Sequence, residues 1–307
     1  MVVLLHLGVM APSRYLMVAL ALVATVTVRV RPAAACAACS CGDPTLTTMG
    51  AEQPFKGRLR ISAEVRHRSD AYGSGSSRAE IDEVGLVLGA SYAPRWWLQL
   101  AASMPIVMRT VDTPTSSDDI REIGDLDLSS KLTVWRDRAW APRRLVGIQG
   151  GVKLATAPVL EDDNGLPLAI EAQPGTSSID LTLGASYARF AEPWSLYASV
   201  AGRLPVWRRE DIAVGSGARG TLALQYQPEY DWAMRLGTNV RVDAPARLDG
   251  YRDPNTGGVV IYASPGLAIT PREDFLLEFS INVPVVNLLD GVHDEGPIVS
   301  VTGVYDL

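Results

Sequence analysis

Three cysteines stand close together near the start of the chain, at Cys36, Cys39 and Cys41 in the stretch CAACSC. Thiolates at this spacing can bind a soft metal ion, but a complete tetrahedral site needs a fourth ligand. In an oxidising compartment two of the thiols can instead form a disulfide. A lipid on Cys36 is the third interpretation, although the preceding Ala33-Ala34-Ala35 lacks the usual leucine of that signal. Because the number of cysteines is odd, all three interpretations stay open, and the three cysteines are candidate metal ligands.

Catalytic side chains are scarce in the rest of the sequence. A serine or cysteine nucleophile needs a neighbouring base, and the histidines of the chain are His6, His67 and His293. His67 alternates in step with apolar residues and His293 lies in a polar stretch, so we interpret both as surface residues. The sequence also has no glycine-rich phosphate loop and no HExxH motif. We therefore expect no enzyme activity, no catalytic residue and no cofactor.

Charged residues recur in an alternating pattern, as in GDLDLSSKLTVW at residues 124–135. Polar and apolar residues take turns there, which is the period of a β-strand with one polar face and one apolar face. A membrane β-barrel turns the apolar face to lipid and the polar face to its lumen. The charged residues that we expect to line the lumen are Arg58, Arg60, Glu64, Arg66, Glu83, Asp125, Asp127, Lys131, Lys153, Asp180, Arg203, Arg219, Arg235, Arg241 and Glu278.

Segments with this alternation follow one another along most of the chain. There are about twelve, each long enough for the roughly 9–11 residues with which a tilted strand crosses a bilayer. Short turns and longer polar loops alternate between them, which predicts an all-β fold, a transmembrane antiparallel up-and-down β-barrel. The strand ranges are 58–68, 83–93, 96–108, 124–135, 144–156, 178–189, 194–207, 217–227, 232–242, 258–269, 275–285 and 297–307, and the long loops are 69–80, 109–122, 157–177, 208–216, 243–257 and 286–296.

The polar faces of a barrel this size have two interpretations. Both signs of charge are present, so the faces can line a pathway and set its selectivity. Alternatively, paired charges can fill a narrow barrel as a structural ladder. About twelve strands lie between the small filled barrels and the water-filled porins of about sixteen, so size does not decide between the two.

Aromatic side chains gather beside the short turns. They are Trp96, Trp97, Trp135, Trp140, Trp194, Trp232, Tyr92, Tyr187, Tyr226 and Tyr230. Trp and Tyr favour the boundary between lipid and water, because an apolar ring and a polar tip suit it. We expect an aromatic girdle on the periplasmic side, where outer-membrane barrels have their short turns. A soluble sandwich whose strands begin with tryptophan is the alternative, but it does not account for the alternating loop lengths.

The first residues have the features of a targeting segment. Arg14 precedes the apolar run 15–28, and Ala33-Ala34-Ala35 offers a small-residue cleavage site. We expect a signal peptide at 1–35, a periplasmic cysteine-containing segment at 36–54 and the barrel at 55–307. The composition is 47% hydrophobic and 20% charged, and the mean hydropathy is +0.10. The 34 acidic residues outnumber the 28 basic ones even with the signal included, so we expect no nucleic-acid partner.

Two features repeat along the predicted strands. LGASYA occurs at 88–93 and again at 183–188, each time at the end of a strand that enters a short turn. Pro105, Pro205 and Pro284 each lie near the far end of a strand, and proline favours strand ends and bulges because it lacks an amide hydrogen. A four-strand unit repeated three times would space these prolines evenly round the barrel. Unrelated strand exits are the alternative explanation.

Several of these motifs resemble one family, the outer-membrane β-barrel transporters of the phenol meta-degradation pathway type. The resembling stretches are IGDLDLSSKL at 123–132, LGASYA at 183–188, LPV at 204–206 and VTGVYDL at 301–307. The last one also resembles the C-terminal signal that the outer-membrane assembly machinery recognises, with Leu307 in place of the more frequent phenylalanine. The resemblance implies the passage of small, often hydrophobic compounds across a bacterial outer membrane.

Three functions agree with these predictions. The first is a channel or facilitated transporter for a small-molecule solute in the bacterial outer membrane, with membrane lipid and the assembly machinery as its other partners. The second is a scaffold or binding barrel that is closed to solutes and whose cysteine segment binds a soft metal or a partner. The third, with the least support, is a membrane-embedded hydrolase.

Overall fold

The computed structural model describes residues 56–73, 78–114, 117–139, 141–161, 173–208, 212–248, 251–252 and 256–307. The predicted signal peptide and the cysteines Cys36, Cys39 and Cys41 lie outside the described residues, and so does Trp140. The division of the chain into a signal peptide, a cysteine-containing segment and a barrel therefore stays a prediction.

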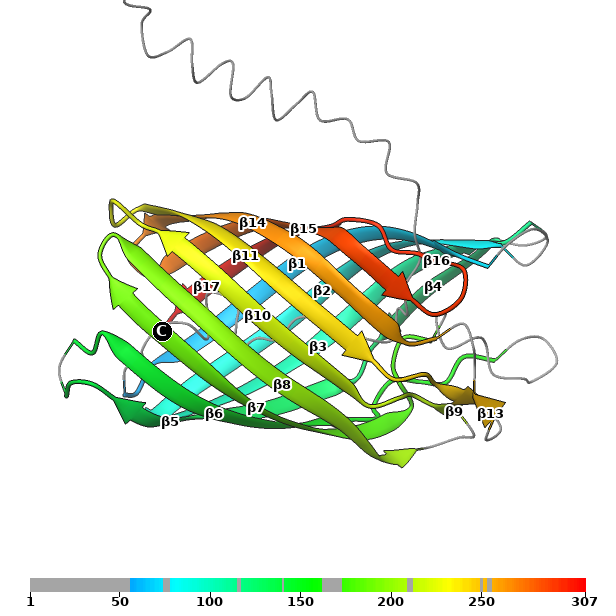
Figure 1. Cartoon of the computed structure of the whole chain (residues 1–307), viewed down its shortest axis with the longest axis horizontal. Coiled ribbons are helices and arrows are strands. Elements are labelled where there is room, and N and C mark those ends of the chain that lie inside the picture. The colour runs from blue at the N-terminus through cyan, green and yellow to red at the C-terminus, as the bar shows by residue number, and fades with distance from the viewer. Residues whose placement is uncertain are drawn as a thin grey trace, which may run out of the picture. The chain divides into compact units, whose positions relative to one another are not determined.

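Twelve long strands form a closed antiparallel barrel within the described part of the chain (Figure 1). Each long strand pairs with its neighbours in chain order, which confirms the up-and-down topology expected from the alternation. The long strands are β1 (Leu59–Tyr72), β2 (Ala79–Arg95), β3 (Leu98–Asp112), β5 (Leu126–Arg136), β6 (Arg144–Leu154), β7 (Ser178–Ala191), β8 (Trp194–Arg208), β10 (Gly217–Tyr226), β11 (Trp232–Asp243), β14 (Gly258–Arg272), β15 (Phe275–Leu289) and β17 (Ile298–Asp306).

The barrel closes where β1 meets β17. The two strands pair from Arg60 opposite Asp306 to His67 opposite Val299, while the other edge of β1 pairs with β2 along its whole length. Leu59 and Leu307 extend the seam with two backbone hydrogen bonds of 3.3 and 2.7 Å. A closed sheet leaves no unpaired strand edge, which is the condition for a β-structure in hydrocarbon.

Short strands extend the barrel at the end that carries the long loops, here called the long-loop end. They are β4 (Ser117–Ile123), β9 (Ile212–Ala213), β12 (Arg247–Leu248), β13 (Tyr251–Arg252) and β16 (His293–Asp294). β4 pairs with the far half of β3 and leads into β5, so the loop predicted at 109–122 is wrong. Most of that stretch is a strand hairpin, because its polar residues alternate on a ladder that continues past the expected membrane span.

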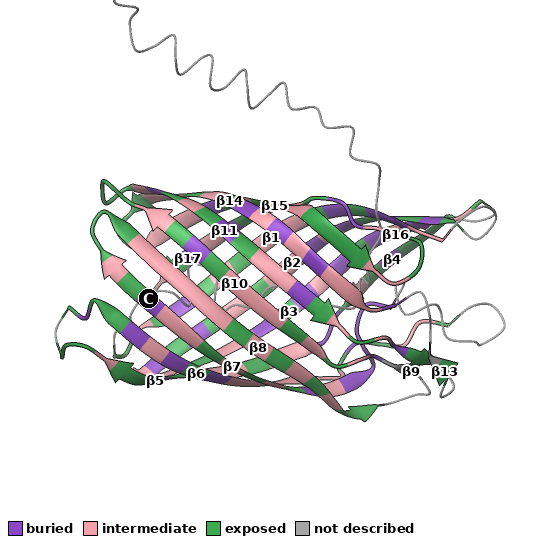
Figure 2. Ribbon diagram, in the orientation of Figure 1, coloured by how far each residue is buried: buried purple, intermediate pink, exposed green. Residues whose placement is uncertain are grey.

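The two faces of the barrel differ in polarity as predicted, and Figure 2 shows that exposure changes from residue to residue along the strands. On β5, Leu128 and Val134 lie outward and are 43% and 52% exposed, whereas Thr133 lies inward and is buried, as is Asp125 just before the strand. Large exposed apolar side chains continue round the outer face on every long strand. Such a continuous apolar surface is rare on a soluble monomer and matches the lipid-facing belt of a membrane barrel.

Among the described residues there is no helix with the length and apolarity needed to span a bilayer.

The opposite end of the barrel, here called the short-turn end, carries the aromatic girdle. The turns there are as short as 96–97, 192–193 and 273–274. Trp194 packs against Tyr226 with the rings tilted and their centroids 4.7 Å apart, and Trp232 approaches Tyr226 edge-on at 6.4 Å. The guanidinium of Arg136 lies 3.6 Å from the ring centre of Trp96. The predicted gathering of aromatic rings beside the short turns is thus confirmed for the described residues.

The three prolines of the LPV-like motifs lie at irregularities in the ladder. Pro205 and Pro284 each lie at a register shift, where one strand gains a residue relative to its partner. At Pro105 the partner of β3 changes from β4 to β5, and the Pro105 carbonyl accepts a hydrogen bond from Gly124 N at 2.8 Å. The register shifts at Pro205 and Pro284 agree with the preference of proline for strand ends and bulges, which bend and twist a strand locally. Descent from a repeated unit stays a hypothesis.

Candidate functional site: the lumen of the barrel

The charged residues predicted to line the lumen fall into groups at different depths. Arg58 and Arg60 lie at the short-turn end, where both contact Asp306 across the seam between β1 and β17. The two hydrogen bonds from Arg60 to Asp306 measure 2.5 and 2.8 Å. A second group surrounds a cavity at mid-depth, and a third forms a belt near the long-loop end. The first group therefore fastens the seam, whereas the other two border the space through which a solute would pass.

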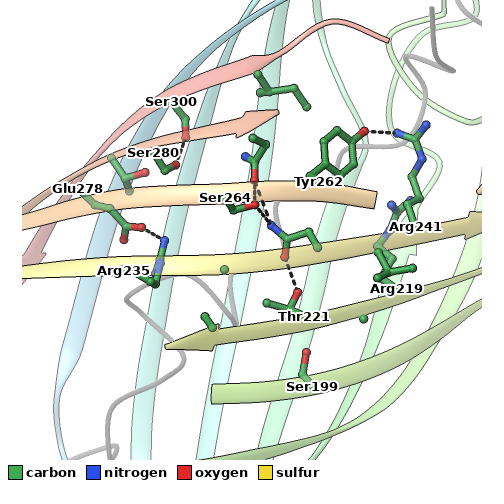
Figure 3. A pocket seen from close by; sticks show the side chains of 18 of the residues that line it. Ser199, Arg219, Thr221, Arg235, Arg241, Tyr262, Ser264, Glu278, Ser280 and Ser300 are labelled. Atoms are coloured by element: carbon green, nitrogen blue, oxygen red, sulfur yellow. Dashed lines mark hydrogen bonds and ion pairs between the residues drawn. The ribbon is translucent and has the colours of Figure 1, made fainter. Parts of the chain in front are cut away.

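A cavity of about 170 Å³ occupies one side of the lumen at mid-depth (Figure 3). Hydroxyl and carboxamide groups form much of its wall. Thr221 donates a hydrogen bond of 2.7 Å to Asn239 Oδ1, and Asn239 Nδ2 donates to Ser264 at 2.8 Å and to Asn282 at 3.0 Å. Ser264 in turn donates to Asn282 Oδ1 at 2.6 Å. Side chains of this kind both donate and accept, so the wall can exchange hydrogen bonds with a polar solute.

Charged side chains stand at both ends of this cavity. Arg235 and Glu278 form an ion pair on the side nearer the short turns. Glu64 lies at the same level on β1, one strand beyond β17. Arg219 and Arg241 lie on the side nearer the long loops. All five residues were predicted to line the lumen, and the structure brings them together round one space.

A belt of alternating charges follows the inner wall near the long-loop end. Lys153 Nζ lies 3.0 Å from Asp125 Oδ2 and 3.2 Å from Asp180 Oδ2. Arg203 continues the belt, with one nitrogen 3.1 Å from Asp180 and another 3.3 Å from Asp243. Asp180 lies between two bases and Asp243 contacts three, so the belt offsets much of the cost of removing these charges from water.

The belt continues across β11 and β14. Arg241 Nε lies 3.2 Å from Asp243, and its other two nitrogens bond to Glu295 at 2.7 and 2.8 Å in a bidentate pair. Tyr262 accepts a hydrogen bond of 3.2 Å from Arg241 and donates one to Glu295. Arg219 lies 3.9 Å from Asp243 on the lumen side. A bidentate arginine–carboxylate pair fixes orientation as well as charge, so this part of the wall is rigid.

A third part of the belt lies on β1, β2 and β3. Arg68 contacts Asp70 at 3.3 Å and Glu83 at 2.9 Å, and Arg109 Nε donates to the same Glu83 oxygen at 2.9 Å. Arg109 also donates to the backbone carbonyl of Gln173 at 3.3 Å. These four charged side chains are buried. They tie the wall to the segment that follows the long loop between β6 and β7.

Residues 173–178, here called the inward segment, are buried within the barrel at the long-loop end. The carboxylate of Asp125 holds this segment and the start of the same loop: Oδ2 accepts Thr176 N at 2.8 Å, and Oδ1 accepts Ala157 N at 3.1 Å. Gln173 bonds through its side chain to both backbone groups of Leu160, at 2.9 and 2.8 Å. A β-carbon on Gly175 would lie 2.6 Å from Asp125 Oδ1, so glycine allows this close approach.

Several members of the belt are not among the predicted lumen residues, namely Arg68, Asp70, Arg109, Asp243 and Glu295. The predicted strands end before the last four of these residues and place them in loops, and Arg68 is not assigned to the lumen. The signal was present, because Arg68 and Asp70 continue the alternation of the residues before them. Three predicted lumen residues, Arg66, Asp127 and Lys131, keep their inward alternation on β1 and β5 and lie outside the groups described above.

The remaining residues predicted to bear on chemistry are the histidines and the candidate metal ligands. His67 is half-exposed on the outer face and lies 3.2 Å from Asp82, which agrees with its interpretation as a surface residue. Among the residues that the structure describes, no group of three His, Cys, Asp or Glu side chains could hold a metal ion. Cys36, Cys39 and Cys41 stay candidate ligands by prediction alone.

Comparisons with known proteins place the fold. Neither protein-family models nor curated proteins match the sequence. The solved COG4313 outer membrane channel from Pseudomonas putida F1 is similar in structure, with a TM-score of 0.70 over 84% of this chain and 98% of that chain, at 15% identity. The NalP translocator domain from Neisseria meningitidis has a TM-score of 0.49 at 12% identity, over 84% of this chain and 91% of that one. The P. putida toluene transporter TodX has 0.45 at 10%, over 86% and 93%.

Only the first of these likenesses is strong enough to carry an argument, and at that identity the argument concerns the fold. The chain has the fold of an outer-membrane β-barrel channel, as the alternation predicted. The resemblance to transporters of the phenol meta-degradation type is supported at the level of the barrel, and the finer family stays a prediction.

Proposed function

We propose that this chain is a passive channel for small molecules in a bacterial outer membrane. The observation that carries the proposal is the closed barrel with an apolar outer face and a polar lumen that encloses a cavity of about 170 Å³. The short-turn end would face the periplasm, because outer-membrane barrels have their short turns there.

Selectivity in this proposal comes from a narrow, polar passage. The predicted lumen residues carry both signs, and most of them lie in ion pairs, so no single sign of charge dominates the wall. Solutes would be selected by their size and by the hydrogen bonds they exchange with the hydroxyl and carboxamide groups of the cavity. We propose the charged residues of the wall as contributors to that selection.

Bilayer conductance and liposome swelling test the proposal directly. The purified barrel should conduct ions and admit small solutes. Ser264→Trp places a bulky ring in the cavity and should lower both signals, whereas Leu267→Trp on the outer face of the same strand should leave them unchanged. Equal conductance of the two variants, or none in the native chain, would contradict the channel.

The alternative is a scaffold barrel closed to solutes, and one observation favours it. The charge belt and the inward segment both lie at the long-loop end, and a segment held there would narrow the lumen. A scaffold of this kind would insert into membranes and show neither conductance nor swelling. The same assays therefore separate the two functions.

The cysteine segment belongs to this proposal as an untested part. Mass spectrometry of the mature protein separates a lipid on Cys36, a disulfide that removes two hydrogens, and a soft metal retained under native conditions. Replacing Cys39 and Cys41 by Ser should abolish metal binding, because thiolates must be free to ligate. Barrel assembly should be unchanged, because the described strands begin after both residues. A variant that no longer assembles would contradict this independence.

The outer face of β17 supports two further partners, membrane lipid and the assembly machinery. Val299, Val301 and Tyr305 are exposed on one face of that strand, as in the alternating signal that the machinery recognises. Lipid would cover the same face after insertion.

A further inference from the structure

Among the described residues, one carboxylate oxygen of Glu278 has a partner and the other accepts no hydrogen bond. Glu278 is 5% exposed on the inward face of β15, and its Oε1 pairs with Arg235. Its Oε2 is buried and has no hydrogen-bond partner among the described residues. A buried carboxylate oxygen normally accepts hydrogen bonds, and leaving it without a donor is costly. A ligand in the cavity could therefore donate a hydrogen bond to Glu278 Oε2.

A second carboxylate lies at the same depth of the lumen. Glu278 is opposite Thr302 on β17, and Thr302 is opposite Glu64 on β1, so the three residues stand on adjacent strands at one level. All three line the cavity. Adjacent strands are about 4.8 Å apart, which puts the two glutamate backbones about 10 Å from each other. Side chains of this length can close on a small group held between them.

Charged groups of both signs line the cavity. Glu64 and Glu278 are its carboxylates, Arg235 pairs with Glu278, and Arg219 and Arg241 lie toward the long-loop end. The neutral groups nearby are engaged with one another: the hydroxyls of Ser280 and Ser300 lie 2.7 Å apart, and Figure 3 shows both side chains near Glu278, Ser280 on the same strand β15 and Ser300 on the neighbouring β17. The neutral groups beside Glu278 therefore leave its Oε2 without a donor.

We propose that Glu278, Thr302 and Glu64 form a binding site for the ammonium group of a small organic amine within the lumen. This inference rests on the proposed channel and names a class of solute for it. Glu278 Oε2 accepts one N–H of the ammonium, Thr302 accepts a second through its hydroxyl, and Glu64 supplies the second negative charge. The hydroxyl and carboxamide wall receives the polar remainder of the molecule.

The size and chemistry of the site favour this class over others. A cavity of about 150 Å³ holds one benzene molecule, so the space here suits a solute of about six heavy atoms. An anion would meet two carboxylates, and a neutral alcohol would make a hydrogen bond of about half the strength of a charge-assisted one. A divalent cation prefers six or more oxygen ligands, which this wall does not bring together.

The test measures equilibrium binding to the detergent-solubilised full-length barrel by calorimetry at neutral pH. The probes are protonated 2-aminoethanol and ethylene glycol, which differ in one ammonium group. The amine should bind at least about tenfold more tightly than the diol, because a hydrogen bond to a charged group is the stronger one. Glu278→Gln should weaken the amine about tenfold and leave the diol unchanged.

Two further variants keep this test decisive. Glu278→Gln retains an oxygen for Arg235, and a folded barrel is checked first by its heat-dependent migration in gels. Glu64→Gln should weaken the amine by a smaller factor and decides the matter if Glu278→Gln does not assemble. Glu229→Gln is the matched control, because Glu229 is exposed in a turn at the short-turn end and its loss removes the same charge.

The outcomes separate this inference from the channel itself. Equal binding of both probes, or amine binding that survives Glu278→Gln, would refute the ammonium site. It would mean that water in the lumen donates the hydrogen bond to Glu278 Oε2. A barrel that conducts ions but binds no amine refutes the site and keeps the channel. A barrel that binds the amine and conducts nothing refutes the channel and keeps an amine-binding barrel.

Discussion

Asp125 offers the sharpest test of how the long-loop end is built. Its carboxylate accepts two backbone hydrogen bonds from the loop between β6 and β7, one from Ala157 and one from Thr176. Asp125→Ala removes both acceptors at once. Lys153 keeps a carboxylate partner, because Asp180 lies 3.2 Å away. The variant should therefore release the inward segment without leaving an unpaired lysine.

The size of the effect follows from these bonds. A hydrogen bond to a charged group contributes about 1.5–3 kcal/mol, so two of them hold the segment by about 3–6 kcal/mol. Losing even about 3 kcal/mol raises the fraction of time that the segment spends outside the lumen about a hundredfold. Single-channel recordings in planar bilayers should show a higher conductance or more frequent large openings. Amide hydrogen exchange of Thr176 should become faster in parallel.

Asp231→Ala is the control for this experiment. It removes the same charge from an exposed turn at the short-turn end, far along the chain from the loop. If Asp125→Ala and Asp231→Ala gave the same conductance and the same exchange rate at Thr176, the inward segment would not narrow the lumen, and the reasoning would be refuted.

Two further predictions concern the wall and the seam. Leu128→Arg should impair insertion, because a basic residue on the lipid face near the bilayer midplane costs about 2–4 kcal/mol, whereas Ser129→Arg faces the lumen and should be milder. Membrane fractionation and heat-dependent gel migration measure this, and equal tolerance at both positions would contradict the assignment of the faces. Asp306→Ala should destabilise the barrel by about 3–5 kcal/mol, because it leaves the buried Arg60 without its carboxylate. Urea unfolding measures the loss, and Arg60→Ala in the same chain should recover part of it.

The fold was predictable because its main rule is local. Each strand shows its own alternation, so Leu128 and Asp127 could be placed on opposite faces without knowing any distant contact. Turn length and the tryptophans beside the turns then oriented the barrel. The predicted strand ends were less accurate at the long-loop end, because β3 and β4 continue as a polar hairpin beyond the lipid-facing belt and their composition resembles a loop.

The site was predictable only as a set of inward residues. Alternation placed Lys153, Asp180 and Arg203 in the lumen, but it carries no information on which acid pairs with which base. Those pairings depend on register between strands and on a loop that turns inward. The hydrogen bond from Thr176 N to Asp125 joins residues 51 positions apart, and the local sequence of neither residue predicts it. That Glu278 Oε2 has no hydrogen-bond partner among the described residues can likewise be seen only in the structure.

The seam between β1 and β17 has a consequence for the order of folding. Arg60 and Asp306 are 246 positions apart, so the contact that closes the cylinder is also among the most distant in the chain. Neighbouring hairpins can pair as soon as both strands are present, whereas the seam must wait until β17 has been synthesised and delivered. Ring closure of this kind is slow, because a long stretch of chain has to be ordered first. Until then β1 is an open edge that can pair with a foreign strand, and a chaperone in transit would have to shield it.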